Sequence, residues 1–238
     1  PSPTPSPSPT PSPSPTPSPT LPPPGDNERV VDIVNIGVDQ RSDPAGVQRS
    51  VQFKVDGPSI ISAQLSGVDS GKMRLCLVRN DPPQKQCIVV HSGTLTIPVY
   101  DAVQSEWNLT LLGSSGVPGQ YGTVTLRFNS VTPTITLESF RFNGTDDPHY
   151  NGFMVLLDAG SAGNLTFHAE FDGVQSSYQW HLNVANDDIN VVDETDGPSS
   201  SVDRTAALSA GPRYSVIFEE PEPAAALSAF VNATFSWP

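Results

Sequence analysis

Four carboxylates in the C-terminal part of the chain have the residue type and spacing to bind a metal ion. Asp187 and Asp188 follow Asn186, and Asp193 and Asp196 come a few residues later. Carboxylate oxygens in a turn-rich loop are the hard ligands that Ca²⁺ prefers. The segment matches no EF-hand or repeat-type calcium motif. A domain as acidic as this one produces such clusters without any ion, so we expect no cofactor, and Ca²⁺ at these four residues is the one candidate.

None of the four histidines has a second histidine at metal-ligand spacing. Strand alternation places His168 with Glu170, and His181 with Asn183, on outward faces, and we expect the two strands to be neighbours. Such a cluster would form a small polar binding patch or a zinc site. Solvated histidines on a sheet surface are the more common outcome.

Two segments approach catalytic motifs without matching them. Residues 159–163 lack the first glycine of a nucleophile elbow and join two strands, whereas the elbow needs a strand followed by a helix. Residues 67–72 are one residue short of a phosphate-binding P-loop, and Met73 follows instead of Ser or Thr. Both are predicted to be turns, and no acid–base pair stands out, so we expect the chain not to be an enzyme.

The two cysteines, Cys76 and Cys87, lie in apolar strand-like segments on either side of a turn at residues 80–84. This arrangement predicts a cross-strand disulfide that closes a hairpin. Paired cysteines indicate an oxidising compartment, and we expect a secreted or cell-surface protein.

The first 20 residues alternate proline with serine or threonine, and three further prolines precede Gly25. Proline fixes its own backbone and extends the preceding residue, so the segment predicts a polyproline II stalk of about 75 Å. Thr4, Thr10 and Thr16 recur every six residues and would line one face. They are candidate O-glycosylation sites or a docking edge, unless the period reflects repeat expansion alone.

After Gly25 the sequence alternates apolar and polar residues in short runs separated by Gly, Pro, Asn and Asp. This pattern predicts half-buried strands, and no window shows a convincing helical stripe. Trp107, Trp180 and Trp237 are in phase with the apolar positions and are expected in the core. The fold class is all-β: two tandem antiparallel β-sandwiches, Ig-like or jelly-roll-like.

The predicted organisation is a stalk at residues 1–25, a first sandwich with the hairpin disulfide at 26–130, and a second, acidic sandwich at 131–238. An offset of about 106 residues pairs Val78 with Val184 and Trp107 with Tyr214. This self-similarity predicts a diverged tandem duplication.

Charge narrows the range of partners. The net charge is −13, and residues 131–238 contain 3 basic and 15 acidic residues. An acidic surface repels phosphate backbones and anionic lipid headgroups, so nucleic acid is excluded as a partner. No stretch approaches the roughly 20 apolar residues of a membrane span, so this chain is not expected to insert directly into a membrane.

The strand order resembles the bacterial pre-peptidase C-terminal family of β-sandwiches over residues 50–130 and 150–237. The resemblance rests on a Phe/Val-rich opening strand, a Gly turn, a strand ending in Asp and a closing aromatic-rich hairpin. Gly119-Gln120-Tyr121 is similar to the family's Gly-x-Tyr element, whereas its Asp-x-Asp element is missing. The resemblance implies a non-catalytic appendage of secreted enzymes or surface proteins.

Together these features predict an extracellular structural or adhesive module. Its stalk would dock along a cell envelope or a pilus-like filament, with other protein subunits of that assembly as partners. The alternative is a carbohydrate-binding or accessory module of a secreted glycosidase or peptidase, in which the stalk is the interdomain linker and glycans are the ligands.

Overall fold

The computed structural model describes residues 27–38, 49–113, 120–143, 152–172, 178–219 and 228–238, and these form sixteen β-strands. Within these residues no helix could span a membrane. The stalk at residues 1–25, with Thr4, Thr10 and Thr16, lies outside the described residues.

The N-terminal half contains eight strands that alternate buried and exposed residues along much of their length. They are β1 (Glu28–Val38), β2 (Arg49–Val55), β3 (Ser59–Ser66), β4 (Met73–Arg79), β5 (Gln84–Val90), β6 (Gly93–Val99), β7 (Ser105–Gly113) and β8 (Gln120–Asn129).

The C-terminal half contains eight more strands. They are β9 (Thr134–Asn143), β10 (Gly152–Asp158), β11 (Gly163–Asp172), β12 (Tyr178–Ala185), β13 (Asn190–Ser199), β14 (Ser201–Leu208), β15 (Arg213–Glu219) and β16 (Ser228–Ser236).

Each half is a jelly roll. In the N-terminal half the strand orders are β1-β8-β3-β6 and β2-β7-β4-β5. The C-terminal half repeats both orders with every number raised by eight, as the predicted duplication requires. Both are the two four-stranded sheets of an eight-stranded jelly roll. The all-β fold class is therefore confirmed, and of the two architectures expected from the sequence the jelly roll is the one formed.

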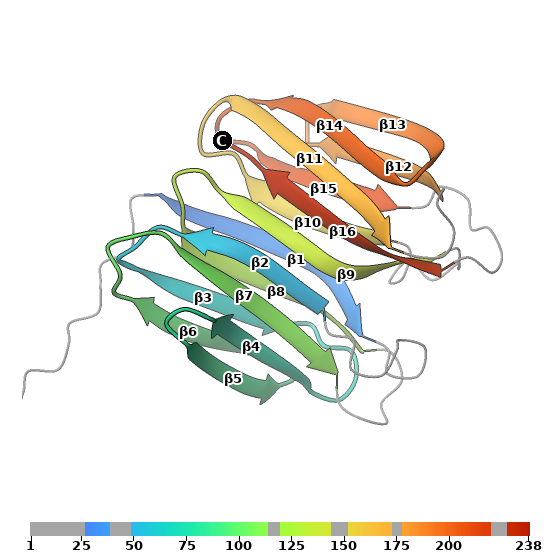
Figure 1. The fold of residues 1–238 in the computed structure, drawn as a ribbon. Helices are drawn as coiled ribbons and strands as arrows, with labels where there is room; N and C mark the ends of the chain where they lie inside the picture. The colour runs from blue at the N-terminus through green and yellow to red at the C-terminus, as the bar shows by residue number, and fades with distance from the viewer. Residues whose placement is uncertain (1–26, 39–48, 114–119, 144–151, 173–177, 220–227) are drawn as a thin grey trace, which may run out of the picture.

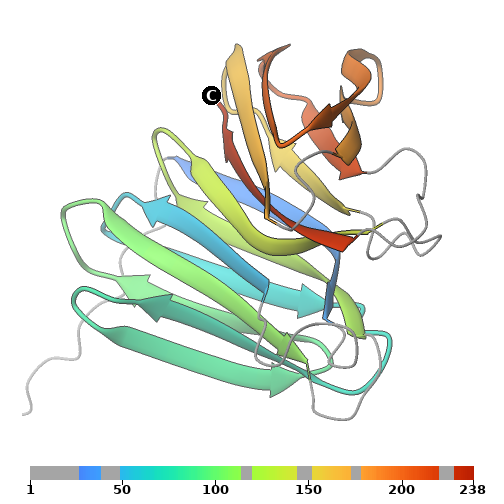
Figure 2. The same ribbon diagram turned by 45° about the vertical axis from the view of Figure 1, so that its right-hand side comes forward.

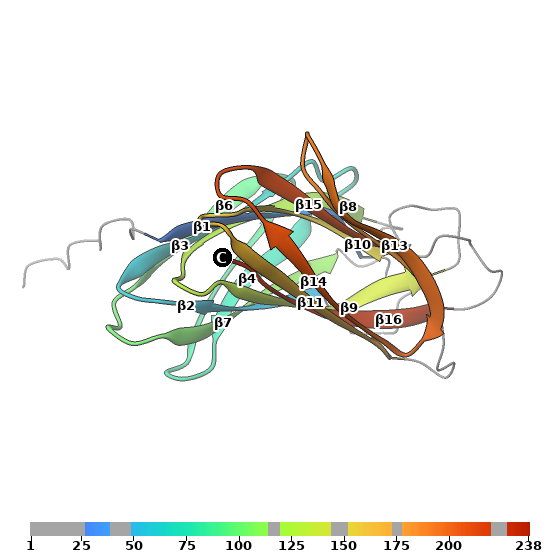
Figure 3. The same ribbon diagram turned by 90° about the horizontal axis from the view of Figure 1, so that it is seen from above.

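The sheets continue from one half into the other. Sheet A runs β13-β12-β15-β10-β1-β8-β3-β6, and sheet B runs β14-β11-β16-β9-β2-β7-β4-β5. The halves join through antiparallel pairing of β1 with β10 and of β2 with β9. Strands of both halves consequently lie side by side in each sheet (Figure 1), also after rotation (Figure 2), and the two sheets form two layers (Figure 3).

A single apolar core fills the space between the two sheets across both halves. Trp107, Trp180 and Trp237 are each at most 4% exposed, as predicted from their phase in the sequence. Phe153 packs edge-on against both Phe140 and Phe235 in the C-terminal half. The predicted disulfide between Cys76 and Cys87 is present and joins β4 to β5.

Arginines tie the two halves together. Arg49 on β2 is 2% exposed and donates hydrogen bonds to the carbonyls of Gly37 and Ser139, which belong to different halves. Its guanidinium also lies 5.9 Å from the Phe230 ring centroid. On the other sheet, Arg213 donates a 2.7 Å hydrogen bond to Asp32 across the same junction.

Replacing Arg49 with methionine should destabilise the whole molecule. The variant leaves two carbonyls without their charged donor, which should lower the free energy of unfolding by about 2–4 kcal/mol. Chemical denaturation followed by tryptophan fluorescence measures this loss. Since the halves share one core, wild type and variant should each unfold in a single transition.

The matched control is Arg127→Ala, which removes an exposed arginine from β8. It should change the free energy of unfolding by less than about 0.5 kcal/mol. Equal losses in both variants, or two separate unfolding transitions in the wild type, would contradict the junction role of Arg49.

Candidate functional site

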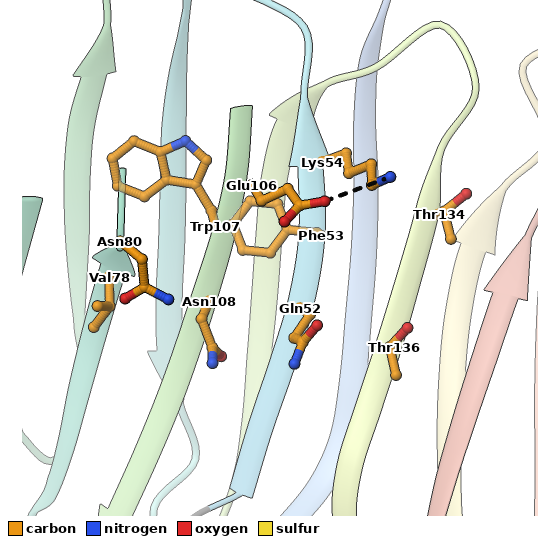
Figure 4. A pocket seen from close by; sticks show the side chains of 10 residues that line it. All are labelled: Gln52, Phe53, Lys54, Val78, Asn80, Glu106, Trp107, Asn108, Thr134 and Thr136. Atoms are coloured by element: carbon orange, nitrogen blue, oxygen red, sulfur yellow. Dashed lines mark ion pairs between the residues drawn. The ribbon is translucent and has the colours of Figure 1, made fainter. Parts of the chain in front are cut away.

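A polar hollow lies on the outward face of sheet B, where β4, β7, β2 and β9 run side by side (Figure 4). Its volume is about 160 Å³. Its lining residues are Gln52, Phe53, Lys54, Val78, Asn80, Glu106, Trp107, Asn108, Thr134 and Thr136. Most of these side chains point away from the core because they alternate with buried neighbours on the same strands.

Neighbouring side chains hold the polar lining in place. Ser50 donates a 2.6 Å hydrogen bond to the carbonyl oxygen of the Asn108 side chain. The Gln52 amide donates to Glu138 on β9. Lys54 and Glu106 form an ion pair with 3.5 Å between Nζ and Oε1. The hollow therefore presents two amide groups that are each oriented by a hydrogen bond, together with one ion pair.

The hollow is bounded on one side by hydroxyl groups from the C-terminal half. Thr134 on β9 hydrogen-bonds Ser236 on β16 at 2.9 Å, and Thr136 hydrogen-bonds Thr234 at 3.0 Å. Amides from one half and hydroxyls from the other can donate and accept hydrogen bonds over one surface. No side chain here is arranged as a nucleophile with an adjacent base.

A second hollow of about 430 Å³ lies further along the same face. It is lined by Thr166, Phe167, His168, Asp203, Arg204, Thr205 and Thr234. His168 Nδ1 lies 2.7 Å from Asp203 Oδ1, and Nε2 lies 3.3 Å from Glu170 Oε1. The hydrogen bond to Asp203 is the main cause of a raised pKa of His168, and Glu170 adds to it against a smaller opposing effect of burial.

His181 lies on the other sheet, so the predicted cluster of neighbouring histidine strands is wrong. His168 is on β11 of sheet B, and His181 is on β12 of sheet A. His181 contacts Asp193 at 2.8 Å and Glu219 at 3.3 Å through its two ring nitrogens. Burial lowers the pKa of His181, but these two carboxylates together raise it more, and the net direction is upward.

The acidic segment predicted to bind Ca²⁺ spans the turn before β13 and β13 itself. Asp187 and Asp188 lie in the turn, Asp193 pairs with His181, and Asp196 accepts a hydrogen bond from the Gly197 amide. Across the described residues, no group of three or more His, Cys, Asp or Glu side chains is arranged to hold a metal ion. Calcium binding by these four residues stays a prediction.

Sequence reasoning did not identify the polar residues of this hollow as a site. Gln52 and Lys54 alternate with Val51, Phe53 and Val55, so their outward direction follows from the sequence. The identity of their neighbours on β9 does not follow from the sequence, because β9 comes about eighty positions after β2 and pairs with it only through the junction of the halves. The alternation of polar and apolar residues was the only feature of the sequence that indicated which side chains face outward here.

Comparisons with known proteins give no family: no family model matches the chain, and no curated protein matches its sequence. The M60 catalytic domain with the CBM51-1 and CBM51-2 domains of ZmpB from Clostridium perfringens matches with a TM-score of 0.28 and 6% identity. That match covers 86% of this chain, which spans only 36% of the other chain.

Two other solved structures match at a similar level. The CBM22-1-CBM22-2 tandem domain of Xyn10C from Paenibacillus barcinonensis has a TM-score of 0.26 and 12% identity over 79% of this chain and 78% of that one. Vicilin from Solanum lycopersicum (tomato) has a TM-score of 0.26 and 7% identity, and the match covers 89% of this chain and 75% of the vicilin chain. At these scores none of the three assigns the chain to a family or a ligand.

The two histidine–carboxylate groups predict a pH dependence of stability. A histidine whose pKa is raised in the folded state binds more protons when folded than when unfolded. Its stabilising contribution is complete below the unfolded pKa of about 6.5 and is lost as the pH rises through the folded value. Denaturant unfolding at a series of pH values should show the free energy of unfolding falling above about pH 6.5.

The double variant His168→Gln/His181→Gln should have a flatter pH profile in this window. The control is His91→Gln, because His91 is exposed between β5 and β6 and contacts no carboxylate among the described residues. Proton NMR should place the titration midpoints of His168 and His181 above the ordinary range. If the free energy of unfolding falls with pH as steeply in the double variant as in the wild type, His168 and His181 are not the cause of the pH dependence.

Proposed function

We propose that this chain is a secreted, non-enzymatic module that binds a neutral glycan in the hollow over β2, β7 and β9. The single observation that carries the proposal is the lining of this hollow by amide and hydroxyl side chains that neighbouring groups already orient. Sugars present dense arrays of hydroxyl groups, each able to donate and accept hydrogen bonds. Asn and Gln amides offer both roles in a fixed plane.

Electrostatics supports a neutral rather than an anionic ligand. The one cation in the hollow, Lys54, is paired with Glu106, and Glu138 lies beside Gln52. The chain as a whole has a net charge of −13. Uronic acids, sulfated sugars and phosphates would all meet repulsion on this surface.

Two features support an extracellular, non-catalytic role. The disulfide between Cys76 and Cys87 is consistent with an oxidising compartment. Among the described residues, no histidine lines the hollow. The carboxylate that lines it, Glu106, forms an ion pair with Lys54. In this proposal, glycan binding serves an accessory role beside other domains or subunits.

A structural or adhesive component of a surface assembly is the second candidate. The observation that favours it is the fusion of both halves into one pair of continuous sheets, which would make a stiff body at the end of the Pro/Ser/Thr stalk. Its partners would be other subunits of a filament or envelope. The resemblance to the pre-peptidase C-terminal family is compatible with either role.

Glycan binding can be tested with immobilised neutral oligosaccharides, namely cello-, xylo-, manno- and chito-oligomers, and titration calorimetry of any that bind. Gln52→Ala and Asn108→Ala should each weaken binding about tenfold, which corresponds to one lost hydrogen-bonding group of about 1.4 kcal/mol. The fold should be unaffected, because both side chains face outward.

The matched controls replace the same residue types on the outward face of sheet A. Gln64→Ala on β3 and Asn183→Ala on β12 should leave the affinity unchanged. Loss of binding in these controls, or the absence of binding to every neutral oligosaccharide, would overturn the proposal. Co-purification of the chain with filaments under the same conditions would favour the second candidate.

A further inference from the structure

The registers of sheet B align one outward-facing residue from every strand into a single row. Starting from the β5 edge, the row runs Lys85, Val78, Asn108, Gln52, Thr136, Thr234, His168 and Asp203. Eight strands about 4.8 Å apart give a length of roughly 34 Å. The row crosses both halves without interruption.

The six polar residues from Asn108 to Asp203 all have a side-chain hydrogen-bond partner. Asn108 accepts from Ser50, and Gln52 donates to Glu138. Within the row, Thr136 bonds Thr234 at 3.0 Å, and His168 bonds Asp203 at 2.7 Å. A surface whose rotamers are already fixed loses less entropy when a ligand binds to it.

The same row connects the two hollows. Thr136 lines the hollow over β2 and β7, Thr234 lines the hollow beside His168, and these two hydroxyls bond each other. Together the hollows extend along the row from β4 to β14. A ligand that fills both must be long and must run across the strands.

The duplication supplies an internal comparison on sheet A. The registers there align Ala185, Ser215, Leu156, Asp32, Thr125, Gln64 and Thr94 in the equivalent row. With Trp107 aligned on Tyr214, Leu156 and Ser215 stand where sheet B has Gln52 and Asn108. Asp32 in the middle of the row is bound by Arg213. The two amides at the centre of the sheet B row are thus absent from its counterpart.

We infer that the ligand is a linear polysaccharide that lies along the whole sheet B row and contacts both halves of the chain at once. This inference rests on the proposed function and identifies the ligand as an extended chain rather than a terminal sugar or a disaccharide. The junction of the two halves therefore completes the binding surface, since neither half alone supplies more than four strands of it.

The test measures how affinity depends on ligand length, with the full chain and an oligomer series from disaccharide to octasaccharide of whichever neutral glycan binds. Affinity should rise with each added unit until the row is filled, by about tenfold or more between the shortest and longest oligomers. The double variant Thr166→Ala/Thr205→Ala changes the lining of the second hollow on β11 and β14, next to the far end of the row. It should weaken octasaccharide binding several-fold and leave disaccharide binding unchanged.

Thr94→Ala/Thr96→Ala is the matched control, because both threonines are exposed on β6 at the edge of sheet A. This control should change the affinity for neither the disaccharide nor the octasaccharide. If disaccharide and octasaccharide bind equally well, or the Thr166/Thr205 variant binds both as the wild type does, the extended-ligand inference fails while glycan binding itself stands. If no oligomer of any length binds, the proposed function fails with it.

Discussion

Backbone pairing between the halves is the constraint on which the rest of this structure depends. Without the pairs β1·β10 and β2·β9, each jelly roll would expose two strand edges with unpaired amides and carbonyls. Pairing them reciprocally satisfies all four edges and merges two small cores into one. Arg49 strengthens the same junction, because its guanidinium bonds carbonyls from both halves. The two sandwiches predicted from the sequence therefore share both sheets.

Sharing sheets also places corresponding strands of the two halves on different faces of the molecule. A pseudo-two-fold relation exchanges the sheets, because β1-β8-β3-β6 belongs to sheet A and its counterpart β9-β16-β11-β14 belongs to sheet B. Each outward face is thus built from complementary parts of both repeats. Gln52 and Asn108 differ from Leu156 and Ser215, which stand in their places on sheet A, and all four side chains point outward, so the two faces differ while the core between them is shared.

The two-residue periodicity of the sequence predicted which side chains face the core. It did not predict which strands are neighbours in a sheet. The alternation in the sequence correctly identified the buried tryptophans and the hairpin of Cys76 and Cys87. The two residue pairs predicted from the offset of about 106 exclude each other in the registers: if Trp107 corresponds to Tyr214, then Leu77 and not Val78 corresponds to Val184. Consecutive strands of a jelly roll often lie in opposite sheets, so His168 and His181 are far from being neighbours. A two-residue period contains no information about which sheet a strand joins.

The outer edges of the sheets give the acidic segment a role that needs no bound ion. After the halves pair, the remaining edges are β6 and β13 in sheet A and β5 and β14 in sheet B. Exposed edges invite pairing with other chains, and charged residues or proline discourage it. β13 carries Asp193, Glu194 and Asp196, and β6 carries Pro98. Asp193 and Asp196, two of the four carboxylates that suggested Ca²⁺ in the sequence, therefore stand where a strand of another molecule would otherwise add to the sheet, and their negative charge disfavours such pairing.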